Sequence, residues 1–236
     1  MSGDELLPPV AGELAGQGAA QVIALLGAES TGKTTLAREL ERILRARGLN
    51  AAMVPEALRL FCDAMGRTPR PHEQAGIAQE QTRLIDAARR AHHIVLADTT
   101  ALMPAVYSDF LFDDKRLYAQ AEADHAQVSM TLLTSLDVAW QADGLNRDGP
   151  HVREPVDALV RAALQRIGRP YAVVAGLGAA RIDHALSAIE HLLDAPARQL
   201  RAASAPRWRW FCERCDDGEC EQHWLSGPSG KDPGSP

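Results

Sequence analysis

Lysine is scarce in this sequence. Of the 25 basic residues in a chain of 236, three are lysines and the other 22 are arginines. The lysines are Lys33, Lys115 and Lys231. Because arginine is chosen almost everywhere else, the lysine inside GAESTGKTTL, Lys33, marks a place where a guanidinium would serve less well.

Long apolar runs, a signal peptide and an excess of positive charge are also absent. No run approaches the ~20 apolar residues of a membrane span. Residues 1–20 have neither a basic start nor a continuous apolar stretch, so we predict a cytoplasmic protein without a membrane partner. The net charge of −6 gives no general attraction to nucleic acid, and we expect no such partner.

What the sequence does contain is an alternation of strand-like and helix-like segments. Short apolar segments predict buried strands over 21–27, 51–56, 93–99, 128–135 and 171–176. Segments rich in Ala, Leu, Arg and Glu predict helices over 33–47, 56–65, 72–91, 114–126, 153–168 and 179–194. This alternation predicts an α/β fold over 21–195, with three layers and a five-stranded parallel sheet. We expect residues 1–20 to be a flexible leader and 196–236 a Cys-rich tail with a disordered end.

The segment GAESTGKT, residues 27–34, matches the phosphate-binding pattern G-x-x-x-x-G-K-[ST] at every fixed position. Glycines let backbone N–H groups turn toward phosphate oxygens, and the helix N-terminus adds partial positive charge. Lys33 reaches the terminal phosphates of ATP as a point charge, and the Thr34 hydroxyl is a ligand for Mg²⁺. The alternative is a glycine turn before an ordinary helix. The residues predicted to bind the nucleotide are Gly27, Glu29, Ser30, Thr31, Gly32, Lys33, Thr34 and Thr35.

Asp98 ends the apolar segment in HIVLADTT. An acid at the carboxyl end of a strand faces the ligand crevice of an open α/β sheet. Beside the phosphate loop it can support Mg²⁺ or accept a proton from a substrate hydroxyl, provided that strands 21–27 and 93–99 are neighbours. The alternative is structural, because Asp98, Thr99 and Thr100 are all good N-caps for a helix at 101–107.

Two further groups of residues are candidates for the substrate side. Glu56 and Arg59 follow the second strand and could meet sugar hydroxyls and phosphate, or form only a surface ion pair. Trp140 offers a flat face for a ring, with a core tryptophan as the alternative. The glycine- and aspartate-rich stretch after it predicts a lid that brings Arg147 and Arg153 over the phosphates.

Together these motifs resemble the bacterial ribosylnicotinamide kinases, the P-loop kinase half of the NAD-biosynthesis regulator and its single-domain relatives. The resemblance covers about residues 20–195. It rests on GAESTGKTTL, the E-x-x-R of PEALRLF, the R-x-I-D of QTRLID, the strand ending in Asp98-Thr99 and the W-x-x-D-G-x-x-R of WQADGLNR.

The resemblance implies a P-loop kinase domain that uses ATP and Mg²⁺ to phosphorylate the 5′-hydroxyl of ribosylnicotinamide or a similar nucleoside. The residues implied at the site are Lys33, Asp98 and Arg147 for catalysis, Thr34 and Asp98 for Mg²⁺, and Glu56, Arg59, Asp98 and Trp140 for the substrate. The sequence departs from the family at Thr100, where an acid is common. A different nucleoside or small metabolite therefore stays open as the acceptor.

The tail holds three of the four cysteines, in FCERCDDGECEQHWL. The C-x₂-C-x₄-C-x₂-H spacing predicts a tetrahedral zinc site, and the alternative is a set of free thiols. The predicted zinc ligands are Cys212, Cys215, Cys220 and His223. The tail could also dock on a protein partner or on the kinase domain itself. It therefore keeps a second function open, that of a regulatory P-loop ATPase acting as a nucleotide switch on that partner.

Overall fold

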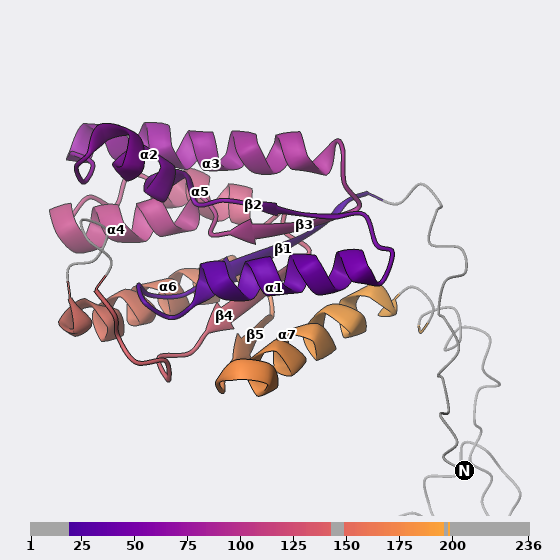
Figure 1. Cartoon of the computed structure of the whole chain (residues 1–236). Coiled ribbons are helices and arrows are strands. Elements are labelled where there is room, and N and C mark those ends of the chain that lie inside the picture. The colour runs from indigo at the N-terminus through magenta and orange to yellow at the C-terminus, as the bar shows by residue number, and fades with distance from the viewer. Residues whose placement is uncertain (1–18, 143–148, 196–197, 199–236) are drawn as a thin grey trace, which may run out of the picture. The chain divides into compact units, whose positions relative to one another are not determined.

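A parallel sheet of five strands forms the centre of the fold (Figure 1). The computed structural model describes residues 19–142, 149–195 and 198. In this part of the chain the strand order is β2-β3-β1-β4-β5, and every pairing is parallel. The strands are β1 (Gln21–Leu26), β2 (Ala51–Val54), β3 (Ile94–Asp98), β4 (Met130–Thr134) and β5 (Tyr171–Val174). The predicted sheet is confirmed, and β1 and β3 are neighbours, which was the condition for placing Asp98 beside the phosphate loop.

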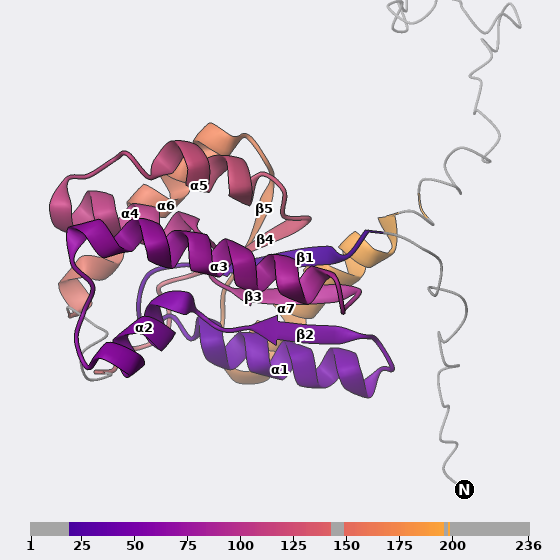
Figure 2. The ribbon, with the colours of Figure 1, turned by 90° about the horizontal axis from the view of Figure 1, so that it is seen from above.

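Helices cover both faces of the sheet, which confirms the predicted three-layer arrangement. In Figure 2 the strands run between α1 on one side and α4 and α5 on the other. The helices on the first face are α1 (Lys33–Ala46) and α7 (Gly178–Leu193). Those packed on the second face are α3 (Gln74–Arg89), α4 (Leu102–Phe112), α5 (Tyr118–His125) and α6 (Arg153–Ile167). The remaining elements are α2 (Ala57–Met65), η1 (Pro71–Glu73) and η3 (Pro150–Val152).

The central strand β1 is buried on both of its faces. Ile23 and Leu25 pack into the core beneath α1 and α7, whereas Ala24 and Leu26 pack toward the helices of the opposite face. This alternation follows from the two-residue period of a strand, and burial of apolar surface stabilises the arrangement. The carboxyl end of β1 is therefore fixed from both sides, and the chain that follows it begins from a rigid support.

Two helices differ from the sequence-based prediction. Helix α4 appeared there only as a short alternative at 101–107, but it extends to Phe112. Pro104 lies in its first turn, where a missing N–H costs no helical hydrogen bond. Most of α4 is apolar and its first half is buried, so no amphipathic stripe marks it in the sequence. Helix α5 starts later than predicted, because Asp113 is left-handed and the Arg116 N–H bonds to the Asp114 carboxylate.

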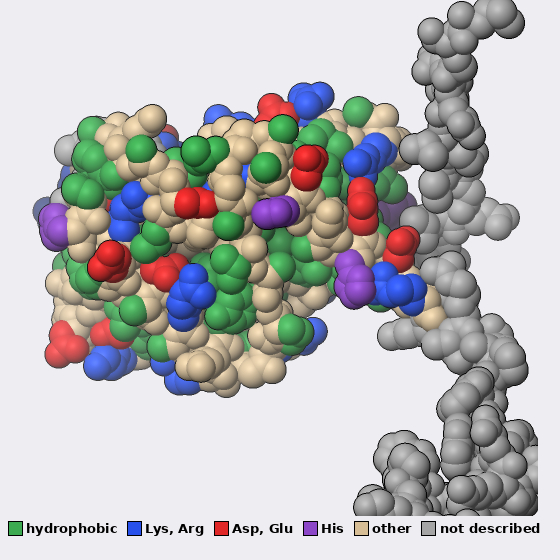
Figure 3. Space-filling model, turned by 90° about the horizontal axis from the view of Figure 1, so that it is seen from below, with side chains coloured by type: hydrophobic (Ala, Val, Ile, Leu, Met, Phe, Trp, Pro, Cys, Tyr) green, Lys and Arg blue, Asp and Glu red, His purple; other side chains and the backbone are tan. Residues whose placement is uncertain are grey.

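The surface mixes charges of both signs. On the face shown in Figure 3, acidic, basic and apolar side chains are interspersed. Among the described residues, none of the helices combines the length and apolar character of a membrane span. The chain divides into two units between Leu193 and Asp194. The limits of leader, domain and tail stay predictions.

Candidate functional site

The phosphate loop connects β1 to α1 and depends on two glycines. Gly27 has φ 145°, and a Cβ atom on it would come within 2.2 Å of the Thr134 hydroxyl oxygen. Gly32 has φ 77° and is the N-cap of α1. A Cβ at Gly27 would clash, so that position requires glycine, whereas at Gly32 there is room for a Cβ and only the left-handed backbone favours glycine.

Lys33 folds back over the loop from the first position of α1. Its Nζ donates to the carbonyl oxygens of Gly27 and Ala28, each at 2.9 Å. The side chain is 9% exposed. The ammonium group is thus held by two carbonyl oxygens of the loop, and Lys33 lines the cavity beside it, where a polyphosphate would meet the cation.

Thr34 and Asp98 lie together beside the loop, as the pairing of β1 with β3 requires. The Thr34 hydroxyl donates to Asp98 Oδ2 at 2.5 Å. Asp98 is 1% exposed, and its other oxygen, Oδ1, is buried without a hydrogen bond. A buried carboxylate oxygen with a hydroxyl next to it is a hard-oxygen donor set, so these residues fit Mg²⁺. The left-handed φ of 74° at Thr99 shows that the backbone is strained directly after Asp98.

Asp98 is not the N-cap of the following helix. Helix α4 begins after Ala101, and the hydroxyl that accepts a hydrogen bond there is that of Thr100, from the Leu102 N–H at 3.3 Å. The capping alternative therefore applies to Thr100. The carboxylate of Asp98 stays turned toward Thr34.

A cavity of about 520 Å³ extends from the phosphate loop. Its walls come from residues 29–35, from α2 and the loop after it, and from α3 and α4. Glu56 and Arg59 both line it, so the structure brings these predicted substrate residues to the phosphate loop. Gln74, Tyr107 and Phe112 also line it but were not predicted, because they reach the wall only through the packing of α3 and α4. No local motif marks them.

Trp140 lies against the phosphate loop. Its indole N–H donates to Glu29 Oε1 at 3.1 Å, and the Gly149 N–H donates to the same oxygen, also at 3.1 Å. Trp140 is not among the residues that line the cavity. Its role as a substrate contact stays a prediction. Glu29 therefore has a structural role, because its carboxylate holds Trp140 and Gly149 to the phosphate loop.

The remaining predicted residues fall into two groups. Arg153 is buried at the start of α6 and donates to the Leu136 carbonyl oxygen at 3.1 Å, so it fastens the chain after β4. Arg147 and the predicted zinc ligands Cys212, Cys215, Cys220 and His223 lie outside the described residues. Across 19–142 and 149–195, no group of three or more His, Cys, Asp or Glu side chains is arranged to hold a metal ion.

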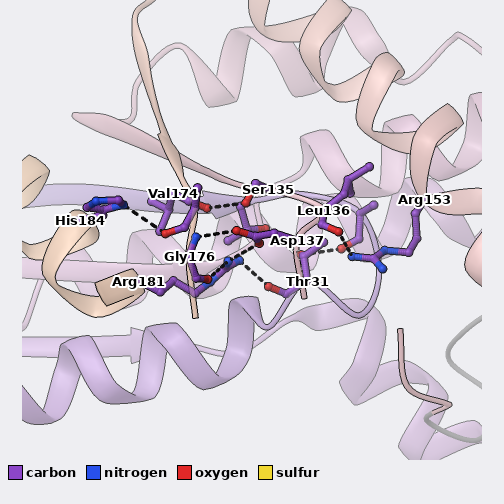
Figure 4. A network of polar contacts seen from close by, with 12 residues as sticks. Thr31, Ser135, Leu136, Asp137, Arg153, Val174, Gly176, Arg181 and His184 are labelled. Atoms are coloured by element: carbon purple, nitrogen blue, oxygen red, sulfur yellow. Dashed lines mark hydrogen bonds and ion pairs between the residues drawn. The ribbon is translucent and has the colours of Figure 1, made fainter. Parts of the chain in front are cut away.

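Arg181, which the sequence did not single out, supports the loop from α7 (Figure 4). Its guanidinium donates to the Thr31 carbonyl oxygen at 2.7 Å, to Asp137 at 2.8 Å and to the Gly176 carbonyl oxygen at 3.0 Å. Burial raises the pKa of Asp137, but hydrogen bonds from Ser135, the Gly176 N–H and Arg181 outweigh it and hold that pKa at about 2. The buried Arg181 guanidinium thus connects α7 to the phosphate loop through Thr31 and to the chain after β4 through the more exposed Asp137.

A second residue that the sequence did not single out, His125, contacts Thr100, the residue that follows Thr99. His125, 2% exposed, bonds through Nδ1 to the Thr100 hydroxyl and through Nε2 to the Thr131 hydroxyl, each at 2.9 Å. Burial, with Arg169 nearby, lowers the pKa of His125 to about 4. Thr100, the position at which the sequence departs from the family that it resembles, is therefore bonded to a neutral histidine.

These features define the class of the protein. A glycine loop and lysine between a central strand and its helix, with a buried acid on the neighbouring strand, form a P-loop nucleotide-binding domain. The family model described as AAA domain matches residues 22–181, and the chain belongs to this family.

Solved structures share the fold. A crystal structure of the protein NadR in complex with NR has a TM-score of 0.61 at 20% sequence identity, covering 74% of this chain and 51% of that one. NadR in complex with NAD and AMP-PNP has a TM-score of 0.59 at 20% identity, covering 81% and 52%. This chain thus spans about half the length of each. The predicted likeness to the kinase half of the NAD regulator is confirmed at the level of fold. No curated protein matches the chain.

Proposed function

We propose that this protein is an ATP-dependent kinase for a small nucleoside-like acceptor, with ribosylnicotinamide as the first candidate. The observation that carries the proposal is the cavity, because it starts at the phosphate loop and continues to Glu56 and Arg59. A hydrolase that only switches a partner has no need of such a space beside the γ-phosphate position. A transferase needs room there for an acceptor.

The chemistry that we propose is phosphoryl transfer to an alcohol. The acceptor oxygen forms a bond to the γ-phosphorus, the bond between that phosphorus and the bridging oxygen of ADP breaks, and the hydroxyl proton leaves. The Asp98 carboxylate takes up this proton or orients the hydroxyl, and Lys33 balances charge on the transferring group. Thr34 and Asp98 would hold Mg²⁺, which supplies further neutralisation of phosphate charge when bound.

The likeness to NadR supports a nucleoside as acceptor. One of the two NadR structures contains NR, and the other contains NAD and AMP-PNP. Because this chain and NadR are only 20% identical, the likeness shows a shared fold, and the nucleoside acceptor is our proposal. In this proposal Glu56, which lines the cavity, accepts hydrogen bonds from ribose hydroxyls, and Arg59 contacts an anionic group.

An acceptor screen tests the proposal. Release of ADP from Mg·ATP is measured with nicotinamide riboside, other ribonucleosides and a no-acceptor control. We expect turnover that depends on the acceptor and forms a 5′-monophosphate. Slow ADP release that no acceptor accelerates would instead support the regulatory ATPase, and the kinase proposal would fail.

A further inference from the structure

Gln74 combines burial, position and an unmet hydrogen-bonding capacity. It is the first residue of α3 and lines the cavity. Its side chain is 1% exposed, and the amide oxygen Oε1 is buried without a hydrogen bond. A buried polar atom left in this way costs folding free energy, so its presence on a cavity wall needs a reason.

Gln81, two turns further along α3, shows how this fold uses a glutamine for structure. It is also 1% exposed, and the spacing of seven residues places both glutamines on one face of the helix. Gln81 Oε1 accepts from the Ala57 N–H at 2.6 Å, and its Nε2 donates to the Pro55 carbonyl oxygen at 3.3 Å. The amide of Gln81 therefore fixes the turn into α2. The oxygen of Gln74 has no such structural task.

The backbone just before Gln74 is held in place. Glu73 forms a two-pronged pair with Arg67, at 2.6 and 2.7 Å, and also accepts from the Arg70 N–H at 2.6 Å. Arg67 in turn lies over the Phe61 ring, 5.5 Å from its centroid. Gln74 thus projects from a fixed point, and its amide is positioned in advance of any ligand.

We propose that Gln74 determines acceptor specificity, by accepting a hydrogen bond from an O–H or N–H group of the nucleoside. The proposal rests on the proposed function, because it assumes that the acceptor occupies the cavity. Sites with a buried acceptor atom discriminate strongly against molecules that lack the matching donor, because the atom then stays unpaired. Gln74 would favour nucleosides that present a donor to α3.

The test compares Gln74→Met with Gln81→Met, since methionine keeps the length of glutamine without its amide. Nicotinamide riboside, adenosine, guanosine, cytidine and uridine are titrated calorimetrically into each protein with a non-hydrolysable ATP analogue present. For the best-bound nucleoside, we expect Gln74→Met to weaken binding about tenfold or more. Its affinity for the ATP analogue and its Tm should not fall, because the variant removes an unpaired oxygen. Gln81→Met should lower the Tm, since it leaves the Ala57 N–H unpaired.

Each result bears on a different claim. If the wild type binds a nucleoside and Gln74→Met binds it equally well, the proposal for Gln74 is wrong while the kinase proposal stands. If Gln74→Met lowers the Tm as much as Gln81→Met, Gln74 is a structural residue and the proposal is overturned. If the wild type binds none of the nucleosides, the proposed function fails and the role of Gln74 fails with it.

Discussion

At the scale of single residues, the site is organised around the carboxylate of Asp98. One of its oxygens accepts from Thr34, and the other is buried and unbonded. Leaving a buried carboxylate oxygen without a hydrogen bond costs folding free energy. Asp98 thus has a carboxylate oxygen available to accept a proton or to bind a metal ion.

Replacing this carboxylate should slow transfer. We expect Asp98→Asn to reduce kcat by about a hundredfold or more, because proton transfer by a positioned side chain contributes at least that much. ATP affinity should change much less. Steady-state kinetics with the acceptor found in the screen measures both, and a kcat within twofold of wild type would remove Asp98 from the transfer step.

His125 should make stability depend on pH. Its pKa is about 4 in the folded protein and about 6.5 when exposed, so the unfolded chain binds more protons between these values. The stabilisation is complete above pH 6.5 and is lost as the pH falls toward 4, at a cost on the order of 3 kcal/mol.

Urea unfolding at pH 7 and pH 4.5 tests this, with His125→Asn for comparison. The loss of unfolding free energy on acidification should be about 2–3 kcal/mol larger in the wild type than in the variant. Equal losses in the two proteins would mean that His125 is not held neutral by burial.

At the scale of elements, the phosphate loop is supported from a helix that the glycine pattern does not include. Helix α7 carries Arg181, whose guanidinium holds the Thr31 carbonyl oxygen and pairs with Asp137. The nucleotide-binding geometry therefore depends on α7 and on the chain after β4, as well as on β1 and α1.

Breaking this support should affect both stability and binding. We expect Arg181→Met to lower the free energy of unfolding by about 1–3 kcal/mol, because it leaves the buried Thr31 carbonyl oxygen without its donor. It should also weaken binding of an ATP analogue. The matched control is Arg47→Met. Arg47, at the end of α1, forms an exposed ion pair with Glu190 of α7, and this pair should contribute under about 1 kcal/mol. Similar losses for both variants, measured by urea unfolding, would contradict the assigned role.

At the scale of the whole molecule, nucleotide binding should raise thermal stability. A ligand at about a hundred times its Kd stabilises by about 2.7 kcal/mol, or roughly 5–10 °C in Tm for a domain of this size. We expect a non-hydrolysable ATP analogue with Mg²⁺ to produce such a shift, and Lys33→Ala to abolish most of it. Lys115→Ala, at an exposed lysine after α4, should keep the shift. If the Lys33 variant kept it too, the lysine would not contact phosphate.

The sequence predicts the sheet well because its strands are short apolar runs bounded by polar residues or glycine. In β1, for example, the apolar run lies between Gln21 and Gly27. It also predicts the phosphate loop and Asp98, since both follow from fixed local spacing at a strand end. Helix α4 is harder to predict, because Pro104 and its many apolar residues give no helical stripe.

The support and the walls of the site were missed for a related reason. No motif includes Arg181 or Gln74, and only the packing of α7 and α3 brings them to the phosphate loop and the cavity. Such residues depend on contacts between distant parts of the chain. Their spacing along the sequence therefore carries no signal.

The two hydrogen bonds to Glu29 affect how this chain can diversify. Trp140 and Gly149 both donate to one carboxylate oxygen of Glu29, so a side chain of the phosphate loop also holds two later parts of the chain. A substitution at Glu29 would remove both contacts at once. Changes at Glu29 and at Trp140 should therefore have non-additive effects on stability, and the phosphate loop can vary at this position only together with its two partners.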